Sequence, residues 1–238
     1  MIVNTTVKQG SPEWFALHVA IPSGSELDRI VTPGGKLCKS EVSTRYRNRK
    51  LAEFITGESI LGEYENDHMA LGKENEPHAV KAFMLQTGRK CTEVGFITRD
   101  DGLVGVSPDR IIDGIDTLEV KCPAMQTHIG YLLDPDSLIA AYRVQLHAEN
   151  WICGGEAWVM SYHPKLPPLI LKVPIDPEFI KKMEDAVNAW LDDMLAKRAE
   201  LEMRYGPFVR KNQQTEENPF GISDQDLEDF MKGVEKRQ

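Results

Sequence analysis

The sequence predicts an α/β fold in which a central mixed sheet is covered on its faces by helices. Segments with helical spacing come first, short strand-like segments follow, and helices return after them. With 238 residues, 41% of them hydrophobic and 27% charged, the chain matches one globular domain with a tail. We expect a single domain over residues 1–206 and a polar, acidic tail with one short helix over 207–238.

Capping residues mark the helices expected before the sheet. Ser11-Pro12-Glu13 starts a helix, because Ser caps the N-terminus, Pro suits the first turn and an acid faces the helix dipole. Gly57 and Gly88 are typical of helix ends. We expect two short helices, one that begins at Ser11 and one that begins at Ser25. Two longer helices are expected over Ser40–Thr56 and Asn66–Thr87, the second with an irregularity at Gly72 and Pro77.

Short apolar segments bounded by turn residues follow, and they predict the strands of the sheet. A helix is expected over Asp136–Trp151, and the later segment Asp176–Tyr205 carries apolar residues at helical spacing. The expected strands are Cys91–Thr98, Leu103–Val106 with a continuation to Asp109, Thr117–Cys122, Ala157–Tyr162 and Leu169–Val173.

Asp109 and the triplet Glu119-Val120-Lys121 lie on neighbouring strands of this expected sheet. Residues i and i+2 of a strand project to the same face, so Glu119 and Lys121 should point together while Val120 faces the core. The dipeptide Asp113-Gly114 is a hairpin signal that would fold Asp109 back toward Glu119. The sequence therefore predicts that two carboxylates and one ammonium group meet.

This set of residues suits metal-assisted hydrolysis of a phosphodiester. Mg²⁺ is held by one or two carboxylates plus substrate phosphate, and Asp109 and Glu119 would supply the carboxylates. Lys121 would stabilise negative charge beside the attacking water, or act as a base if burial lowered its pKa. About two or three Asp/Glu-x-Lys triplets are expected by chance in a chain of this composition. An amphipathic hairpin with a solvated Glu/Lys pair is therefore the alternative.

Composition narrows the class of protein. The net charge of −9 argues against a general DNA-coating protein, although a local basic run would either follow a phosphate backbone or form a solvated helix face. Four cysteines without C-x-x-C spacing predict reduced thiols rather than a zinc or iron–sulfur site. The lack of a long apolar run and of a signal-like start predicts a cytoplasmic protein. The basic run consists of Lys36, Lys39, Arg45, Arg47, Arg49 and Lys50.

Four short motifs resemble those of a known family. They are residues 106–110 with 118–123, Gly72-Lys73 with Glu76 and Ala79, Ala141-Tyr142 with Gln145, His147 and Trp151, and Glu13-Trp14 with Ser25-Glu26. In order and spacing, over roughly residues 10–175, the chain resembles the phage lambda exonuclease group of recombination nucleases, part of the PD-(D/E)xK superfamily. The resemblance implies a restriction-endonuclease-like core.

The resemblance assigns roles to the residues of the triplet and its partner. It implies that Asp109, Glu119 and the backbone carbonyl of Val120 hold Mg²⁺, for which Mn²⁺ would substitute. It also implies that Lys121 is the catalytic lysine.

Three helix residues receive roles from the resemblance alone. Glu76 would help to hold a second metal ion, and Gln145 would position water or phosphate; solvated helix residues are the alternative for both. Met69 matches an apolar wedge that parts the strands at a duplex end, and a core-facing methionine is the alternative.

A polar pocket for the 5′-phosphate of the duplex end is a further implication. Ser25 and Ser107 match serines of that pocket, and His18 stands where an arginine is common. A second family arginine has no counterpart near residues 125–127. Because imidazole lacks the bidentate guanidinium fork and titrates near neutral pH, the departure predicts a weaker or pH-dependent preference for 5′-phosphate.

By this resemblance we expect processive, Mg²⁺-dependent 5′–3′ degradation of one strand of linear double-stranded DNA. The 3′ overhang would go to a phage single-strand annealing protein. A ring-shaped homotrimer, phage or prophage encoded, would surround the DNA in the bacterial host cell, with no membrane involved. Two alternatives stay open: an internal or structure-specific endonuclease of the same superfamily, and a non-catalytic DNA-binding adaptor.

Overall fold

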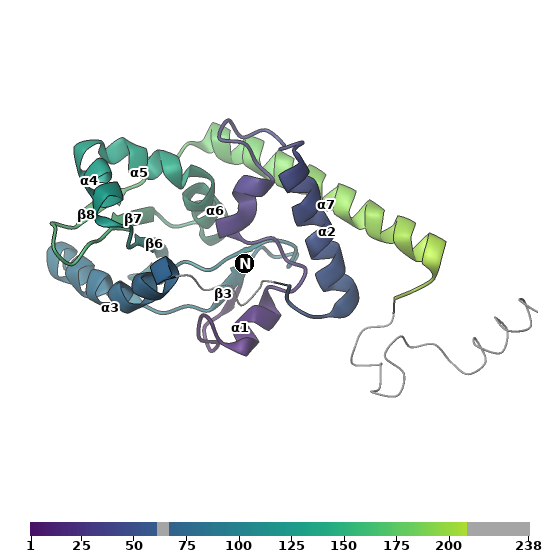
Figure 1. Ribbon diagram of the computed structural model, residues 1–238, viewed down its shortest axis with the longest axis horizontal. Helices are drawn as coiled ribbons and strands as arrows, with labels where there is room; N and C mark the ends of the chain where they lie inside the picture. Colours follow the sequence, from purple (N-terminus) through teal and green to yellow (C-terminus); the bar gives the residue numbers. More distant parts are fainter. Residues whose placement is uncertain (61–66, 209–238) are drawn as a thin grey trace, which may run out of the picture.

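The computed structural model describes residues 1–60 and 67–208, which form two sheets surrounded by helices (Figure 1). β6 and β7 of the larger sheet run parallel, whereas its other neighbouring strands run antiparallel. The predicted fold class, a central mixed sheet flanked by helices, is confirmed. The order of the larger sheet is β2 (Cys91–Thr92), β5 (Arg110–Ile112), β6 (Asp116–Lys121), β7 (Ala157–Ser161) and β8 (Leu169–Lys172).

The smaller sheet corrects one predicted strand. Its order is β1 (Ile2–Asn4), β3 (Phe96–Thr98) and β4 (Gly105–Val106), all antiparallel. The predicted strand Cys91–Thr98 is therefore divided between two sheets. The division falls at Gly95, whose N–H donates to the Asn4 carbonyl over 3.0 Å. A Cβ at Gly95 would lie 2.4 Å from the Val7 carbonyl oxygen, so the N-terminal segment and this turn pass in close contact.

The second predicted strand is shorter than expected, which changes the setting of Asp109. β4 ends at Val106, and Pro108 cannot donate a backbone hydrogen bond to a continuing ladder. Asp109 consequently lies just before β5 instead of ending the preceding strand. The predicted hairpin is present: β5 and β6 pair around Asp113-Gly114, and both turn residues have positive φ, 49° and 91°.

The helices cover the larger sheet from both sides. Val120 and Leu118 of β6 pack in a cluster with Phe83 of α3, whereas Lys121 contacts Gln145 of α6 on the opposite face. The alternation expected for the triplet is thus confirmed. The helices are α1 (Pro12–Leu17), the 3₁₀ helix η1 (Gly24–Arg29), α2 (Glu41–Thr56), α3 (Asp67–Thr87), α4 (Met125–Leu133), α5 (Pro135–Ala141), α6 (Arg143–Cys153) and α7 (Pro177–Tyr205).

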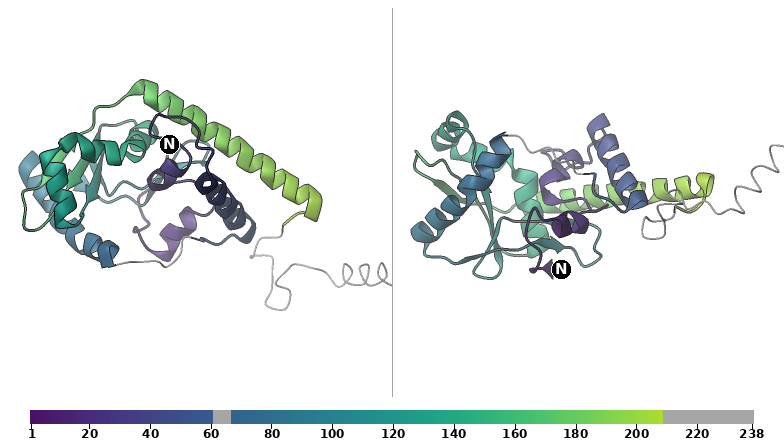
Figure 2. Two further views of the ribbon diagram at one scale, coloured as in Figure 1. Left: turned by 45° about the horizontal axis from the view of Figure 1, so that its top comes forward. Right: turned by 60° about the horizontal axis from the view of Figure 1, so that its bottom comes forward.

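Helix boundaries followed local signals where those signals were strong. Ser40 caps α2 by accepting from Ser43 N, and Gly57 ends that helix with a φ of 71°. Two predictions were wrong: the helix expected over 136–151 is broken at Tyr142 into α5 and α6, and α4 was not expected. α7 is buried at intervals from Phe179 to Met194, and its last turns run past the body (Figure 2).

Three further expectations bear on the described residues. The four cysteines are free. No helix among residues 1–60 and 67–208 is long and apolar enough to cross a membrane. The expected short helix of the tail falls within residues 209–238, which lie outside the described part of the chain.

Candidate active site

The β5–β6 hairpin brings Asp109 beside the triplet. Arg110 pairs with Leu118 at the end of the ladder, and the Val120 N–H donates to Asp109 Oδ2 over 2.6 Å. β6 continues for three residues beyond its last partner on β5. The N–H and C=O of one strand residue point to the same side, so the Val120 carbonyl faces the Asp109 side, outside the β5 ladder.

Lys121 lies in the centre of a polar cluster on the α6 side of the sheet. Its Nζ donates to Glu119 Oε1 over 2.6 Å and to Gln145 Oε1 over 3.3 Å, and it lies 4.4 Å from the centre of the Tyr142 ring. Burial alone lowers the pKa of Lys121, but the charge and hydrogen bond of Glu119 outweigh it and raise the pKa above its usual value. The contacts with Glu119 therefore favour the ammonium form of Lys121 in this structure.

The cluster contains carboxyl oxygens for which its own side chains provide no hydrogen-bond donor in the described residues. Burial raises the pKa of Asp109 well above its usual value, and the charges of Glu119 and Glu76 act in the same direction. Burial and the charge of Glu119 likewise raise the pKa of Glu149. Oε2 of Glu119 and Oε2 of Glu149 are buried without a hydrogen-bond partner in the described residues. Such a group of carboxyls is relieved by a cation.

This chemistry fits a Mg²⁺ site formed by Asp109, Glu119 and the Val120 carbonyl. In the described part of the chain, no three His, Cys, Asp or Glu side chains converge to enclose a metal by themselves. Mg²⁺ does not require such a cage, because it keeps several waters and takes one or two carboxylates plus substrate phosphate. The residues present are consistent with that mode of binding.

Glu76 reaches the cluster from α3 but is held by an arginine. Arg110 Nη1 donates to Glu76 Oε1 over 2.7 Å and also to the backbone carbonyl of Asp109. The Glu76 side chain is 29% exposed and that of Arg110 is 14% exposed. Glu76 thus lies next to Asp109, as expected, with one of its oxygens already engaged.

His18 and Ser107, expected in a phosphate pocket, are in contact, but His18 is buried. Its ring lies between those of Trp14 and Phe96, with centroids 3.9 and 4.0 Å away, and is 2% exposed. His18 Nδ1 lies 2.7 Å from the Trp14 carbonyl and Nε2 lies 3.3 Å from Ser107 Oγ. Burial lowers the pKa of His18. Ser107, which also donates to the Gly95 carbonyl, has more surface to offer a phosphate.

The structure connects the last two expected site residues, Ser25 and Met69, less directly with the cluster around Lys121. Ser25 is exposed on η1, whose start is held beside β4 by the Ser23–Gly105 bridge. Ser25 therefore lies near β4, the strand that Ser107 directly follows. Met69 falls in the first turn of α3, and its side chain lies outside the described part of the structure.

Four residues of the site were missed from the sequence. Gln9 Nε2 donates to the carbonyls of Val94 and Pro108, over 2.9 and 2.8 Å, and so fixes the approach to Asp109. Arg110, Tyr142 and Glu149 contact the cluster as described above. Arg110 and Tyr142 lie within motifs that carry the resemblance, although no role was assigned to them, and Glu149 follows Gln145 by four residues on the same helix face.

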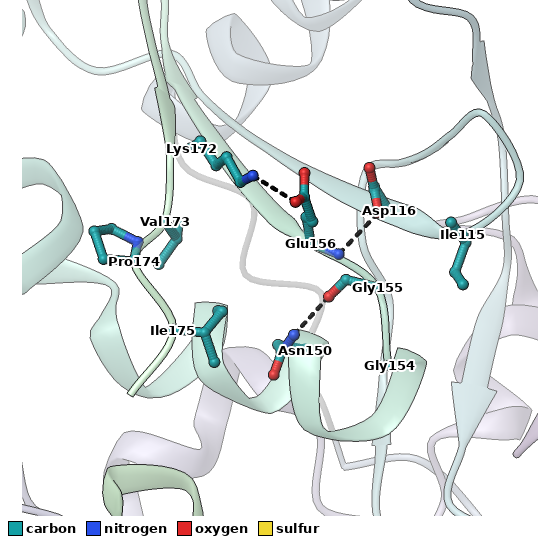
Figure 3. Close-up of a pocket in the computed structure, with 10 residues that line it drawn as sticks. All are labelled: Ile115, Asp116, Asn150, Gly154, Gly155, Glu156, Lys172, Val173, Pro174 and Ile175. Atoms are coloured by element: carbon teal, nitrogen blue, oxygen red, sulfur yellow. Dashed lines mark hydrogen bonds and ion pairs between the residues drawn. The ribbon is translucent and has the colours of Figure 1, made fainter. Parts of the chain in front are cut away.

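A separate pocket of about 490 Å³ lies at the opposite end of β6 (Figure 3). Asp116 there accepts from the Glu156 N–H over 2.8 Å, Glu156 pairs with Lys172, and Asn150 donates to the Gly155 carbonyl. The charged groups of this pocket therefore satisfy one another, and none of the expected site residues lines it. The candidate active site is therefore the polar cluster of Asp109, Glu119, Lys121, Gln145 and Glu149, called the Asp109 cluster below.

Comparison with solved structures supports the fold on which this site is built. An alkaline exonuclease, LHK-Exo from Laribacter hongkongensis, superposes with a TM-score of 0.70 at 24% identity, covering 82% of this chain and 97% of that one. Its complex with dAMP gives 0.72 at 26% identity with the same coverage. A phage-related exonuclease from Haemophilus somnus 129PT gives 0.57 at 15% identity, covering 74% and 96%.

Sequence comparison gives the family. No individually curated protein matches the chain. The pattern of the YqaJ-like viral recombinase domain matches residues 13–156, which include every residue of the Asp109 cluster. The resemblance to recombination exonucleases and the restriction-endonuclease-like fold class are thereby confirmed. The chain belongs to the YqaJ-like viral recombinase family.

Proposed function

We propose that this protein is a Mg²⁺-dependent deoxyribonuclease that degrades one strand of linear double-stranded DNA from the 5′ end. The observation that carries the proposal is the convergence of Asp109, Glu119 and Lys121 at the open end of β6, in a buried cluster with excess acid. The exonuclease names of the similar structures support it.

Each residue has a distinct part in the proposed reaction. A bound Mg²⁺ would supply a Lewis acid and an activated water. Asp109 and Glu119 would hold it, with the Asp109 carboxylate oriented by the Val120 N–H. Lys121, held as an ammonium group, would stabilise negative charge on the reacting phosphate. Gln145, which accepts from Lys121 and donates to Glu149 over 3.4 Å, would keep both groups in place.

The finer features of the activity rest on the family. We propose processive 5′–3′ digestion within a ring-shaped homotrimer, and a 3′ overhang that a single-strand annealing protein receives. We also propose that Ser25 and Ser107 contact the terminal 5′-phosphate, while His18 supports Ser107 from beneath. Because the buried His18 supplies no guanidinium fork, the preference for a 5′-phosphate should be small.

Digestion of a linear duplex with a different label at each 5′ and 3′ end tests the proposal. With Mg²⁺ we expect release from the 5′ ends, inhibition by EDTA, and rates within about tenfold with and without 5′-phosphate, as the loss of one strong charged contact allows. A nick-free circular duplex should resist the enzyme. Cleavage of the circle would contradict an end-dependent exonuclease and favour the endonuclease alternative.

A further inference from the structure

The basic residues between Lys36 and Lys50 lie in three different environments in the structure. Lys50 is fully buried and donates to Glu53 Oε2 over 2.8 Å, and Arg47 pairs with Asp193 of α7. Lys36 and Lys39 lie exposed on the segment before α2. Arg45 and Arg49 instead share one face of α2, which is directed toward η1.

A pocket of about 260 Å³ opens between that face of α2 and η1. Val42, Arg45, Tyr46 and Arg49 are spaced as i, i+3, i+4 and i+7, so they form one helical stripe. Arg29 of η1 completes the wall. Three guanidinium groups therefore line one small pocket in a chain whose net charge is −9.

Two of these guanidinium groups are held in fixed positions. Those of Arg49 and Arg29 lie 4.9 and 5.7 Å from the centre of the Tyr46 ring, and that ring is 2% exposed. Glu26 accepts from Arg49 over 2.5 Å and lies 3.6 Å from Arg29. The Nε of Arg49 is buried and makes no hydrogen bond in the described residues, but it lies 3.9 Å from Glu53 Oε1.

Acidic neighbours neutralise this pocket only in part. Glu26 is one buried carboxylate shared between Arg29 and Arg49. The buried Glu53, which lies 3.9 Å from Arg49, is also paired with Lys50. Glu41 lies 3.7 Å from Arg45, but these side chains are 82% and 71% exposed, so the pair is weak and easily exchanged. The pocket consequently retains positive charge that a ligand can use.

We propose that the pocket formed by Arg29, Arg45 and Arg49 binds a backbone phosphate of the DNA substrate. Guanidinium groups match phosphate oxygens in bidentate geometry and stay charged at any working pH. The proposal rests on the proposed nuclease function, since DNA is the polyanion that this function brings to the surface. η1 packs against both α2, which carries Arg45 and Arg49, and α6, which carries Gln145 of the Asp109 cluster (Figure 1).

This pocket gives a net acidic nuclease a place to hold DNA away from its catalytic carboxylates. A contact to one phosphate carries no sequence information and fixes the register of the duplex. The side chains of Arg45 and Arg29 are 71% and 44% exposed, so salt screens their attraction for a single phosphate ion and leaves little binding energy. The pocket therefore favours a polyanion over free phosphate. DNA binding additionally releases condensed counterions.

The salt dependence of duplex binding tests the proposal. Binding of a short blunt duplex is measured between 50 and 200 mM salt, in an Asp109→Asn background that prevents digestion. The double variant Arg29→Gln/Arg45→Gln removes the contact to one phosphate, so it should lower the slope of log K against log salt by about 1 and weaken binding equally for unrelated sequences. The control Lys181→Gln/Lys182→Gln removes the same charge from α7, where each lysine pairs with an acid four residues away.

Equal slopes for the pocket variant and its parent would overturn the proposal, as would equal losses in the pocket and control variants. Inorganic phosphate should displace DNA no better than chloride at equal ionic strength; an extra displacement that the pocket variant abolishes would assign the pocket to free phosphate. If the double variant fails to fold, Arg45→Gln alone should still lower the slope, by no more than about 1, whereas an unchanged slope would overturn the proposal. Binding is read without cleavage, so these failures are separate from a lack of Mg²⁺-dependent digestion, which would overturn the proposed function.

Discussion

At the scale of single residues, the site depends on charges that are buried before any ligand arrives. Asp109 accepts the Val120 N–H, and Lys121 bridges Glu119 and Gln145. Within the described part of the chain, the single ammonium group pairs with the Glu119 carboxylate alone, and one oxygen each of Glu119 and Glu149 is buried without a hydrogen-bond partner. This imbalance is costly to the folded chain and makes cation binding favourable, which is the arrangement a metal-dependent nuclease needs.

The site was predictable where it depended on local geometry. Asp109, Glu119 and Lys121 are joined by one hairpin, so strand alternation and the Asp113-Gly114 turn sufficed to place them. Arg110 was missed because its partner Glu76 lies 34 residues away on α3, and no sequence spacing encodes that contact. The burial of His18 was equally inaccessible, since Phe96 comes from a distant strand.

We predict that His18 makes folding sensitive to pH. Burial, the largest cause, lowers the pKa of His18 below its unfolded value of about 6.5, so the unfolded chain binds the proton more readily. Stability is therefore complete above that pH and falls as pH drops toward the folded pKa, by at most about 1.4 kcal/mol per pH unit.

Urea unfolding at pH 7.5 and 5.5 measures this effect. His18→Phe keeps an aromatic ring between Trp14 and Phe96 but cannot titrate, so the difference between the two pH values should shrink. His147, whose pKa burial also lowers, should leave a residual difference in the variant. An unchanged pH dependence in His18→Phe would show that His18 does not titrate in this range.

At the scale of elements, helices and strands that depend on contacts between neighbouring residues were easier to predict than those that depend on distant parts of the chain. α2 and α7 were predicted correctly because their caps, Ser40 and Asp176, act within one turn. β1 was missed because its three residues are strand only through pairing with β3, over 90 residues away. α4 was missed because Ala124 provides no side-chain cap.

We predict opposite effects for two glycine substitutions. A Cβ at Gly155, before β7, would lie 2.3 Å from the Ile115 carbonyl oxygen, so Gly155→Ala must displace backbone at the start of the β6–β7 pair. Gly130 in α4 has open space, so Gly130→Ala should stabilise by about 0.5–1 kcal/mol. Gly155→Ala should destabilise by about 1–3 kcal/mol in the same denaturant titration. A neutral Gly155→Ala would contradict the close approach of the two segments.

At the scale of the whole molecule, the charge distribution raises the question of how an acidic chain holds DNA. A net charge of −9 opposes association with a polyanion unless basic groups are gathered in one place or the protein surrounds its substrate. The arginine pocket beside η1 serves the first requirement. The proposed ring-shaped homotrimer would serve the second, because encirclement would prevent dissociation between cuts.

We therefore predict a trimer in solution. Light scattering on the eluting protein should give the mass of three 26.8-kDa chains at micromolar concentration, and challenge with excess unlabelled duplex should not stop digestion that has started. A monomer that still digests processively would remove encirclement as the explanation.

The most direct measurement compares Mg²⁺-dependent release of nucleotides from a linear duplex by Asp109→Asn and Asp113→Asn. Both changes remove one negative charge from the same hairpin, but Asp109 lies in the buried cluster, whereas Asp113 pairs with Arg89 at the exposed turn. Asp109→Asn should lower the rate by at least about 10³-fold while keeping the thermal midpoint within a few degrees, and Asp113→Asn should retain activity. Near-normal digestion by folded Asp109→Asn protein would contradict the assignment of this cluster as the cutting centre.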